Sequence, residues 1–259
     1  ALILSGGVGK GGAARMAARA ALRMGAGLVT LGCPPAALIE NAAQLDAIML
    51  TRIPDADALT KMLEEDDRIS GLGLGPGLGT DAREAALLRA ALATSRATVL
   101  DADALTLLSQ DNDCMAALHN NCLLTPHGGE FARMFPDIAD RMKDPQASCS
   151  KVDAVREAAA RCGATVLLKG PDTVIATPDG ATAIASSSYS RSAPWLGTAG
   201  AGDVLTGITT GLMARGLSPF DAARAGAVIH VDAALAFGPG IIAEDLPDLL
   251  PGALRALPL

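Results

Sequence analysis

Short apolar runs alternate along this chain with alanine-rich stretches of helical periodicity. The apolar runs suit strands buried on both faces, and they predict strands at residues 1–4, 28–31, 69–74, 98–101, 122–124 and 165–169. The alanine-rich stretches predict helices near residues 12–24, 81–95 and 151–162. Strands that alternate with helices in this way predict an α/β fold, in which a mainly parallel sheet carries helices on both faces.

The pattern changes toward the C-terminus. Segments 173–177 and 181–184 flank the turn Pro178-Asp179-Gly180 and predict an antiparallel hairpin at one edge of the sheet. Helices dominate from Asp203 onward. Residues 136–150 are polar, and we expect them to form a mobile surface segment.

The length and composition predict one large domain over residues 1–259. Half of the chain is hydrophobic, and no repeat, charge block or low-complexity linker divides it. The first residues already belong to a predicted strand and no Met precedes them, so we expect residues upstream of that strand to be missing.

Charge and composition also narrow the classes of partner. A net charge of -7 with only 2% aromatic residues argues against nucleic acid, because its binding needs basic patches and stacking rings. No signal peptide is visible, and His230 and Asp232 interrupt the longest C-terminal apolar stretch, so no membrane span is expected. The five cysteines form no C-x-x-C pair, which predicts reduced thiols in a cytoplasmic protein.

Two glycine-rich loops follow predicted strands. The first, residues 7–12, matches G-x-G-x-x-G, but the next strand ends in Gly32-Cys33 and has no acid for a ribose hydroxyl, which excludes a Rossmann site. Lys10 is followed by Gly11 and not by Ser or Thr, which excludes a Walker A loop. Two interpretations of this loop remain: a glycine turn that lets a ligand come close to the backbone, and a glycine turn that serves packing alone.

The second loop covers residues 71–79, where glycine alternates with other residues. We favour the approach of a ligand at residues 75–79 over a strand packed tightly beneath a helix.

Polar side chains stand where predicted strands end. Asp101 and Asp103 could hold a magnesium-phosphate complex directly or through water, although Asp103 could also cap the next helix. His127 and Glu130 follow another strand and start a helix. Lys169 ends a third strand beside a glycine, where it could bind a nucleotide phosphate or form a surface salt bridge.

The other two histidines, His119 and His230, fall among apolar residues of predicted helices. We interpret both as structural, because a histidine in such a position is seldom a ligand.

The segment 197–203, GTAGAGD, runs straight into an apolar helical stretch. A glycine turn that enters a helix points backbone N–H groups and the positive end of the helix dipole at one place, which suits a phosphate or an oxyanion. Asp203 could then take a proton from a hydroxyl that is being phosphorylated. It could equally be an N-cap residue, and this segment alone does not separate the two functions.

Together these motifs resemble the NAD(P)H-hydrate dehydratase family of the ribokinase-like superfamily. The resemblance covers nearly the whole chain, and its motifs occur in the family's order at residues 20–29, 75–79, 101–105 and 197–205. It implies a ribokinase-like three-layer sandwich with an antiparallel edge hairpin. It further implies a lyase that restores NADH and NADPH from their hydrates, NADHX and NADPHX, with ADP or ATP as phosphoryl donor and Mg²⁺ as cofactor, in a homo-oligomer such as a tetramer.

The resemblance also assigns the site. It implies that Asp203 and His127 are catalytic, that the hydrate contacts Ala13, Gly79, His127 and Asp203, and that Glu130 and Asp101 contact magnesium through water. The nucleotide-binding residues implied are Lys169, Gly170, Pro171, Asp172, Thr173, Gly200 and Gly202. The family usually has Pro at the position of Gly128, and small residues at those of Pro171 and Asp172, which leaves the choice of donor open.

Two other functions compete with this hypothesis. An ordinary ribokinase-like kinase of a vitamin precursor would share the Gly-x-Gly-Asp helix start, but such kinases typically present Asn where His127 stands. A catalytically silent nucleotide-binding module would not need Asp203, Lys169 and Glu130 together.

Overall fold

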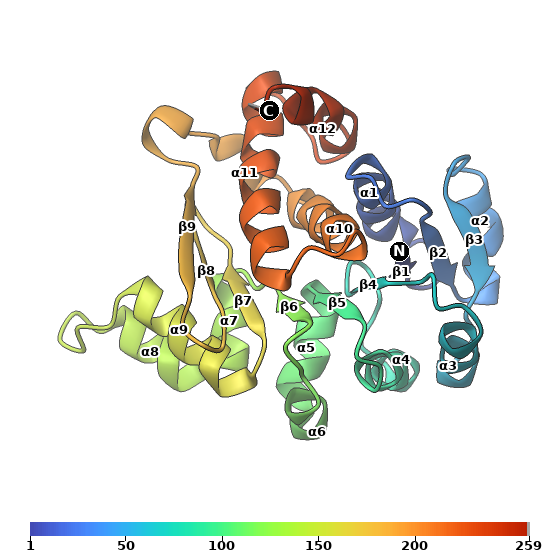
Figure 1. Ribbon diagram of the computed structural model, residues 1–259, viewed down its shortest axis with the longest axis horizontal. Helices are drawn as coiled ribbons and strands as arrows, with labels where there is room; N and C mark the ends of the chain where they lie inside the picture. The colour runs from blue at the N-terminus through green and yellow to red at the C-terminus, as the bar shows by residue number, and fades with distance from the viewer. Residues whose placement is uncertain (258–259) are drawn as a thin grey trace.

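A nine-stranded sheet runs through residues 1–257, the part of the chain that the computed structural model describes (Figure 1). The strand order is β3-β2-β1-β4-β5-β6-β7-β8-β9. All neighbouring strands are parallel except in the β7–β8 and β8–β9 pairs, which are antiparallel. The strands are β1 (Leu2–Leu4), β2 (Thr30–Cys33), β3 (Met49–Arg52), β4 (Gly71–Leu74), β5 (Ala97–Leu100), β6 (Cys122–Leu124), β7 (Thr165–Leu168), β8 (Asp172–Ala176) and β9 (Thr182–Ser186).

Helices cover both faces of this sheet, so the predicted α/β fold with an antiparallel edge hairpin is confirmed (Figure 1). One face carries α1 (Gly11–Arg23), α10 (Ala201–Ala214), α11 (Pro219–Phe237) and α12 (Leu246–Arg255). The other face carries α3 (Ala56–Glu65), α4 (Ala82–Leu92), α5 (Ala102–Gln110), α7 (Gly128–Met134), α8 (Pro136–Lys143) and α9 (Lys151–Cys162). The short helices α2 (Leu38–Ala42) and α6 (Asn112–Ala116) lie between longer elements.

The strands are apolar throughout because both of their faces are covered. In β4, Leu72 and Leu74 pack into the core beneath α4 and α5. Gly73 lies on the opposite face, where a Cβ would come within 2.9 Å of the Thr210 hydroxyl of α10. This two-sided burial produces continuous apolar runs in place of the alternation that a half-exposed strand would show.

Helices α1 and α10 approach each other at glycine. A Cβ on Gly207 would lie 2.0 Å from the carbonyl oxygen of Ala17, and one on Gly211 would lie 2.6 Å from that of Ala21. The absence of side chains at these two positions lets the α10 backbone rest against α1. This contact helps to hold the N-terminus of α10 above the carboxyl ends of the parallel strands.

The predicted strands and helices are all present, although β2 begins two residues later than expected, at Thr30. The edge strand β3 and several short helices had no clear apolar signal, since β3 is largely exposed. The prediction of a mobile segment at residues 136–150 is wrong over α8, which starts at Pro136 and buries Ile138 and Ala139. The prediction that His119 is helical is also wrong, because it lies in the turn before β6.

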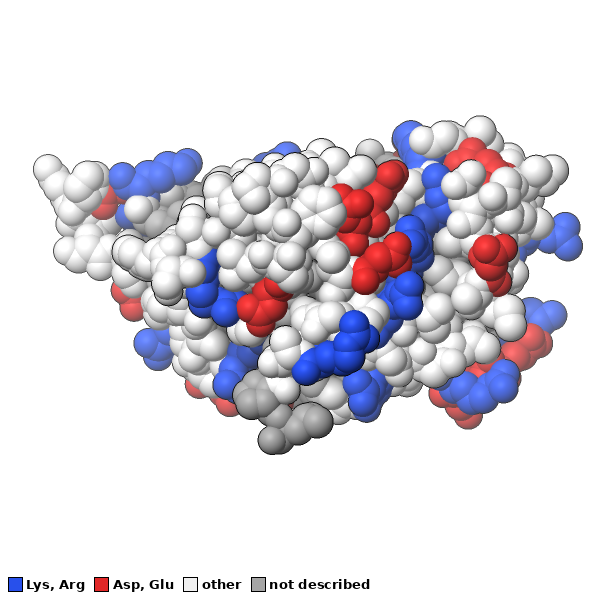
Figure 2. Space-filling model, turned by 90° about the horizontal axis from the view of Figure 1, so that it is seen from above, with Lys and Arg blue, Asp and Glu red and all other residues white. Residues whose placement is uncertain are grey.

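Charged residues of both signs share the surface. On the face seen in Figure 2, Lys and Arg side chains lie beside Asp and Glu, and uncharged residues make up most of the area. Among residues 1–257, no helix combines the length and the apolar character that a membrane crossing requires. The five cysteines are free thiols, four of them buried.

Candidate active site

The N-terminus of α10 presents free backbone donors. Its N-cap is Gly200, which has a φ of 91°, and no side chain caps the helix. Within residues 1–257, the N–H groups of Gly202 and Asp203 have no backbone or side-chain acceptor. Asp203 is the third residue of the helix and not its cap, so the N-cap interpretation of Asp203 is wrong. Unbonded N–H groups and the positive end of the helix dipole are the features that suit an anion.

Lys169 stands beside this helix start. Its Nζ lies 2.7 Å from Oδ1 of Asp101 and 3.9 Å from Oε2 of Glu130. Asp101 is only 1% exposed, and its Oδ2 accepts a hydrogen bond of 2.8 Å from the hydroxyl of Thr206 on α10. A Cβ on Gly202 would lie 3.1 Å from the Lys169 ammonium, so glycine lets this cation reach the helix terminus. The surface salt-bridge alternative for Lys169 does not hold, because both of its acidic partners are buried.

Asp203 has the electrostatics of a proton acceptor. Burial, together with the charges of Asp101, Asp103 and Glu130, raises its pKa to about 6, and the Lys169 ammonium opposes this shift. A carboxylate whose pKa lies near neutrality is ionised at physiological pH and is a better base than an ordinary Asp. Two of these carboxylates, Asp101 and Glu130, keep the Lys169 ammonium in place.

The turn after β5 carries backbone strain. Ala102 has a φ of 47°, which is unusual for a residue with a Cβ, and it separates Asp101 from Asp103. Asp101 is the N-cap residue of α5, so Asp103 does not cap this helix. Oδ2 of Asp103 instead accepts a hydrogen bond of 2.8 Å from the backbone N–H of Gly79, which ties the β4–α4 turn to the site.

Backbone packing explains two glycines of the 75–79 turn. A Cβ on Gly75 would lie 1.7 Å from the carbonyl oxygen of Asp101, and one on Gly77 would lie 2.6 Å from that of Lys10. Of these three glycines, Gly79 is the one beside which we still expect a ligand. Its φ is 100°, and a Cβ there would have the Glu84 side chain as its nearest neighbour, at 3.5 Å. A Cβ on Gly77 would also lie 3.5 Å from the Cβ of Ala13, so the start of α1 lies against the same turn.

His127 is the N-cap residue of α7. Its Nδ1 accepts a hydrogen bond of 2.9 Å from Gly129 N–H, and Oε2 of Glu130 accepts one of 2.7 Å from His127 N–H. This capping box fixes the imidazole orientation and leaves 58% of the side chain exposed. Its Nε2 is 3.4 Å from Oε1 of Glu130, the acid that also contacts Lys169.

A cavity of about 460 Å³ adjoins Lys169 and the α10 N-terminus. Five of the predicted nucleotide-binding residues line it: Lys169, Gly170, Pro171, Thr173 and Gly202. Asp172 and Gly200 do not line it, and Asp172 is exposed to solvent at the start of β8. The sequence prediction missed most of the other lining residues, among them Ser187, Ser188, Ser192, Ala227 and His230. These five come from loops and from α11, where the sequence has no recognisable motif.

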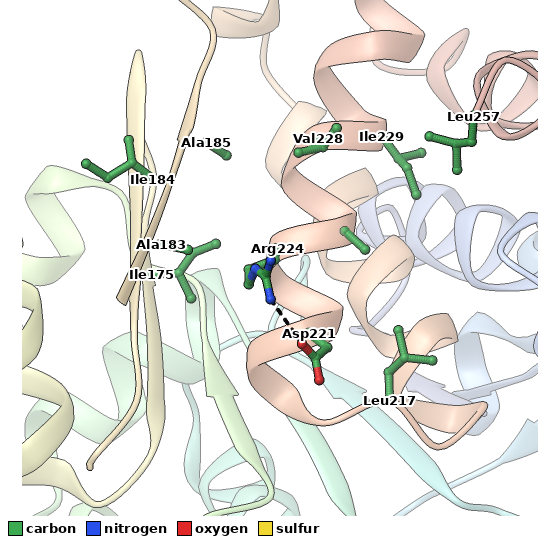
Figure 3. Close-up of a pocket in the computed structure, with 11 residues that line it drawn as sticks. Ile175, Ala183, Ile184, Ala185, Leu217, Asp221, Arg224, Val228, Ile229 and Leu257 are labelled. Atoms are coloured by element: carbon green, nitrogen blue, oxygen red, sulfur yellow. Dashed lines mark hydrogen bonds and ion pairs between the residues drawn. The ribbon is translucent and has the colours of Figure 1, made fainter. Parts of the chain in front are cut away.

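A second hollow, of about 540 Å³, lies between the β8–β9 hairpin and α11 (Figure 3). Its lining is apolar apart from Asp221 and Arg224, which pair with each other at 3.4 Å. Its lining contains one acid, whereas Asp203 at the start of α10 has three other acids near it. The residues suited to phosphate chemistry therefore lie at the α10 cavity and not in this hollow.

The chain matches a known protein family over nearly its whole length. A sequence model of the NAD(P)H-hydrate dehydratase family matches residues 1–250. The chain belongs to this family. The resemblance based on the glycine turns and the strand-end residues is thereby confirmed.

Curated relatives of this dehydratase-family chain carry matching names. The bifunctional NAD(P)H-hydrate repair enzyme of Moorella thermoacetica is 37% identical over 99% of the chain and 49% of that enzyme. The ADP-dependent (S)-NAD(P)H-hydrate dehydratase of Neisseria meningitidis is 37% identical over 90% of the chain and 75% of that enzyme. The chain spans about half the length of the bifunctional relatives.

Solved structures share the fold. A ribokinase-like superfamily protein from Enterococcus faecalis has a TM-score of 0.79 at 24% identity, over 98% of this chain and 86% of its own. The ADP/ATP-dependent NAD(P)H-hydrate dehydratase of Bacillus subtilis, co-crystallised with ATP and Mg²⁺, has a TM-score of 0.75 at 24% identity, over 98% of this chain and 88% of its own. These likenesses show that the fold is ribokinase-like.

Proposed function

We propose that this dehydratase-family chain restores NADH and NADPH from NADHX and NADPHX, with ADP or ATP as the phosphoryl donor. One observation carries the proposal: a half-buried carboxylate, Asp203, lies on a helix terminus whose N–H groups are free, and Lys169, held by buried acids, lies beside it. This arrangement combines a base, an anion site and a cation, which phosphoryl transfer requires.

In the first step, the ring hydroxyl oxygen of the hydrate attacks the terminal phosphorus of the nucleotide. The hydroxyl proton passes to Asp203, and the bond to the leaving phosphate oxygen breaks, which releases AMP from ADP or ADP from ATP. The N–H groups of Gly202 and Asp203 stabilise the charge on the moving phosphoryl group. Lys169 neutralises phosphate charge from the side of the cavity.

In the second step, the phosphorylated ring loses phosphate. The ring C–O bond breaks, the electron pair leaves with phosphate, and the adjacent ring carbon gives up a proton to water, which restores the dihydropyridine. Phosphate leaves far more readily than hydroxide, which is the chemical reason to consume a nucleotide. His127, exposed and fixed by its capping box, is the residue that we assign to the hydrate together with Ala13 and Gly79.

Magnesium fits this site as a water-mediated partner. Both carboxylate oxygens of Asp101 are engaged, by Lys169 and Thr206, so direct coordination would break these contacts. No cluster of three or more His, Cys, Asp or Glu side chains within residues 1–257 forms a metal site. We propose that nucleotide phosphates hold Mg²⁺ and that Glu130 and Asp101 contact it through water, where the ion would neutralise phosphate charge.

The remaining features of the proposal concern the whole protein. We propose a cytoplasmic enzyme, and the five free thiols support this location. We also propose a single domain over residues 1–259, which the continuous sheet supports.

For the assembly we propose a homo-oligomer, a tetramer as the resemblance implies. Exposed large apolar side chains such as Ile39, Ile184 and Tyr189 support association, and light scattering of the purified protein measures it.

The activity is tested by incubating the protein with NADHX or NADPHX, Mg²⁺ and either ADP or ATP. We expect the absorbance of the reduced nicotinamide to return, with one phosphate released per nicotinamide restored. A reaction without nucleotide is the control and should give no recovery. If neither donor gives recovery with either hydrate, the proposed function is wrong.

The pH dependence should report the raised pKa of Asp203. The carboxylate must be ionised to accept the hydroxyl proton, so kcat should fall below a pKa of about 6 and not near the ordinary Asp value of 3.8. Stopped-assay rates between pH 4.5 and 8 measure this acidic fall in kcat. The range runs from about 1.5 units below that pKa to 2 units above it. A profile that stays flat down to pH 4.5 would contradict this environment for Asp203.

A further inference from the structure

His230 is a buried imidazole whose Nε2 has no hydrogen-bond partner within residues 1–257. It lies on α11, is only 7% exposed, and lines the cavity beside Lys169 and Gly202. A buried nitrogen without a partner costs free energy, since it has given up its water. A polar atom left unpaired in the wall of a cavity is therefore an unused binding group.

The surroundings of the ring indicate its charge. Burial and the Lys169 ammonium together lower the pKa of His230 to about 4, so the ring is neutral at physiological pH. A neutral imidazole carries one N–H and one bare nitrogen. The backbone of Ala201 favours the protonated ring and so opposes this shift.

A neutral ring with its proton on Nδ1 fits these surroundings. The N–H of Ala201 is already bonded to the carbonyl of Thr198 at 3.3 Å, which leaves the Ala201 carbonyl as the acceptor for the ring. Because Nε2 has no partner, Nδ1 is the nitrogen that would donate to this carbonyl. Nε2 is then a hydrogen-bond acceptor, and a phosphate oxygen, itself an acceptor, cannot satisfy it.

We propose that His230 binds the nucleoside part of the donor nucleotide, with Nε2 accepting a hydrogen bond from the base amino group or from the ribose 2′-hydroxyl. This inference rests on the proposed use of ADP or ATP. The cavity offers suitable surroundings, because Leu205, Ala227 and Val231 form apolar walls near His230 while Lys169 provides the phosphate end. His230, which the sequence pattern presented as structural, thereby becomes a binding and specificity residue.

The test is ADP affinity, measured by calorimetry without any hydrate. Replacing His230 by Leu removes the acceptor, and we expect ADP to bind about tenfold more weakly. His230→Gln can place an amide oxygen near the position of Nε2, and it should keep most of the affinity. His119→Leu is the matched control, since His119 also has unpartnered ring nitrogens but lies outside the cavity. Thermal melts confirm that each variant is folded.

IDP and 2′-deoxy-ADP identify the donor group. If the base amino group is the donor, the wild type should prefer ADP to IDP, and His230→Leu should lose this preference. If the ribose hydroxyl is the donor, the same loss should occur between ADP and 2′-deoxy-ADP. Either result supports the proposal.

Three results would overturn it. His230→Leu could bind ADP as tightly as the wild type, or it could bind all three nucleotides more weakly by one common factor, which would indicate a general structural effect. In both cases the proposed function would stand. Failure of the wild type to bind either ADP or ATP would instead overturn the nucleotide part of the proposed function, and this inference with it.

Discussion

Asp203→Asn should reduce kcat for hydrate repair by about 10³-fold or more, because the variant cannot accept the hydroxyl proton. The N–H groups of the α10 terminus and Lys169 are unchanged, so ADP binding should remain measurable by calorimetry. A loss confined to kcat would show that Asp203 acts in the chemical step. Asp57→Asn, which changes an exposed acid in the first turn of α3, is the matched control and should keep the wild-type rate.

The same substitution should stabilise the fold. A carboxyl whose pKa is raised in the folded state costs stability when it is ionised, so the cost is present above pH 6 and disappears below the unfolded value of 3.8. We therefore expect Asp203→Asn to raise the free energy of unfolding by about 2 kcal/mol at pH 8 and by much less at pH 4. Urea titrations at the two pH values measure this difference. A variant that keeps the wild-type rate and gains no stability would show that Asp203 is neither strained nor catalytic.

Gly207→Ala should destabilise the protein although alanine favours helices. The added Cβ would lie 2.0 Å from the Ala17 carbonyl oxygen, against backbone that can move only if α1 and α10 separate. We expect a loss of about 3 kcal/mol in the free energy of unfolding, at the upper end for overpacking. Urea unfolding followed by circular dichroism gives this value.

Gly252→Ala provides the matched control for this prediction. Gly252 is also inside a helix, α12, but a Cβ there would meet no atom within 4 Å. Its replacement should leave stability unchanged or raise it by up to about 1 kcal/mol through helix propensity. Equal effects of the two substitutions would contradict the close contact of α1 with α10.

Much of the fold follows from local sequence signals. Strands covered on both faces are continuous apolar runs, so β5, β6 and β7 could be located within a residue or two. The hairpin was marked by Pro178-Asp179-Gly180, whose residues favour a turn. By contrast, β3 is an exposed edge strand, and α8 is a short helix with only a small buried face, so neither produced a clear periodic signal.

Local signals also located part of the site. Parallel strands end at one edge of the sheet, which is why Asp101, His127 and Lys169 could be expected near one another. The function of each residue could not be read in the same way. The glycines at 75 and 77 had suggested a ligand, but the backbone of Asp101 and of Lys10 occupies the space beside them.

The sequence by itself determined the alternation of strands and helices and the family, and it predicted an anion site at the start of α10. Only the tertiary structure decided that Asp203 is half-buried among carboxylates, that Lys169 pairs with Asp101 and that His230 faces the cavity. Lys169 and Asp101 are 68 residues apart, and Thr206 and Asp101 are 105 apart. A pKa or an unpaired nitrogen depends on the burial and charge that such distant segments create together, and no local pattern of residues encodes them.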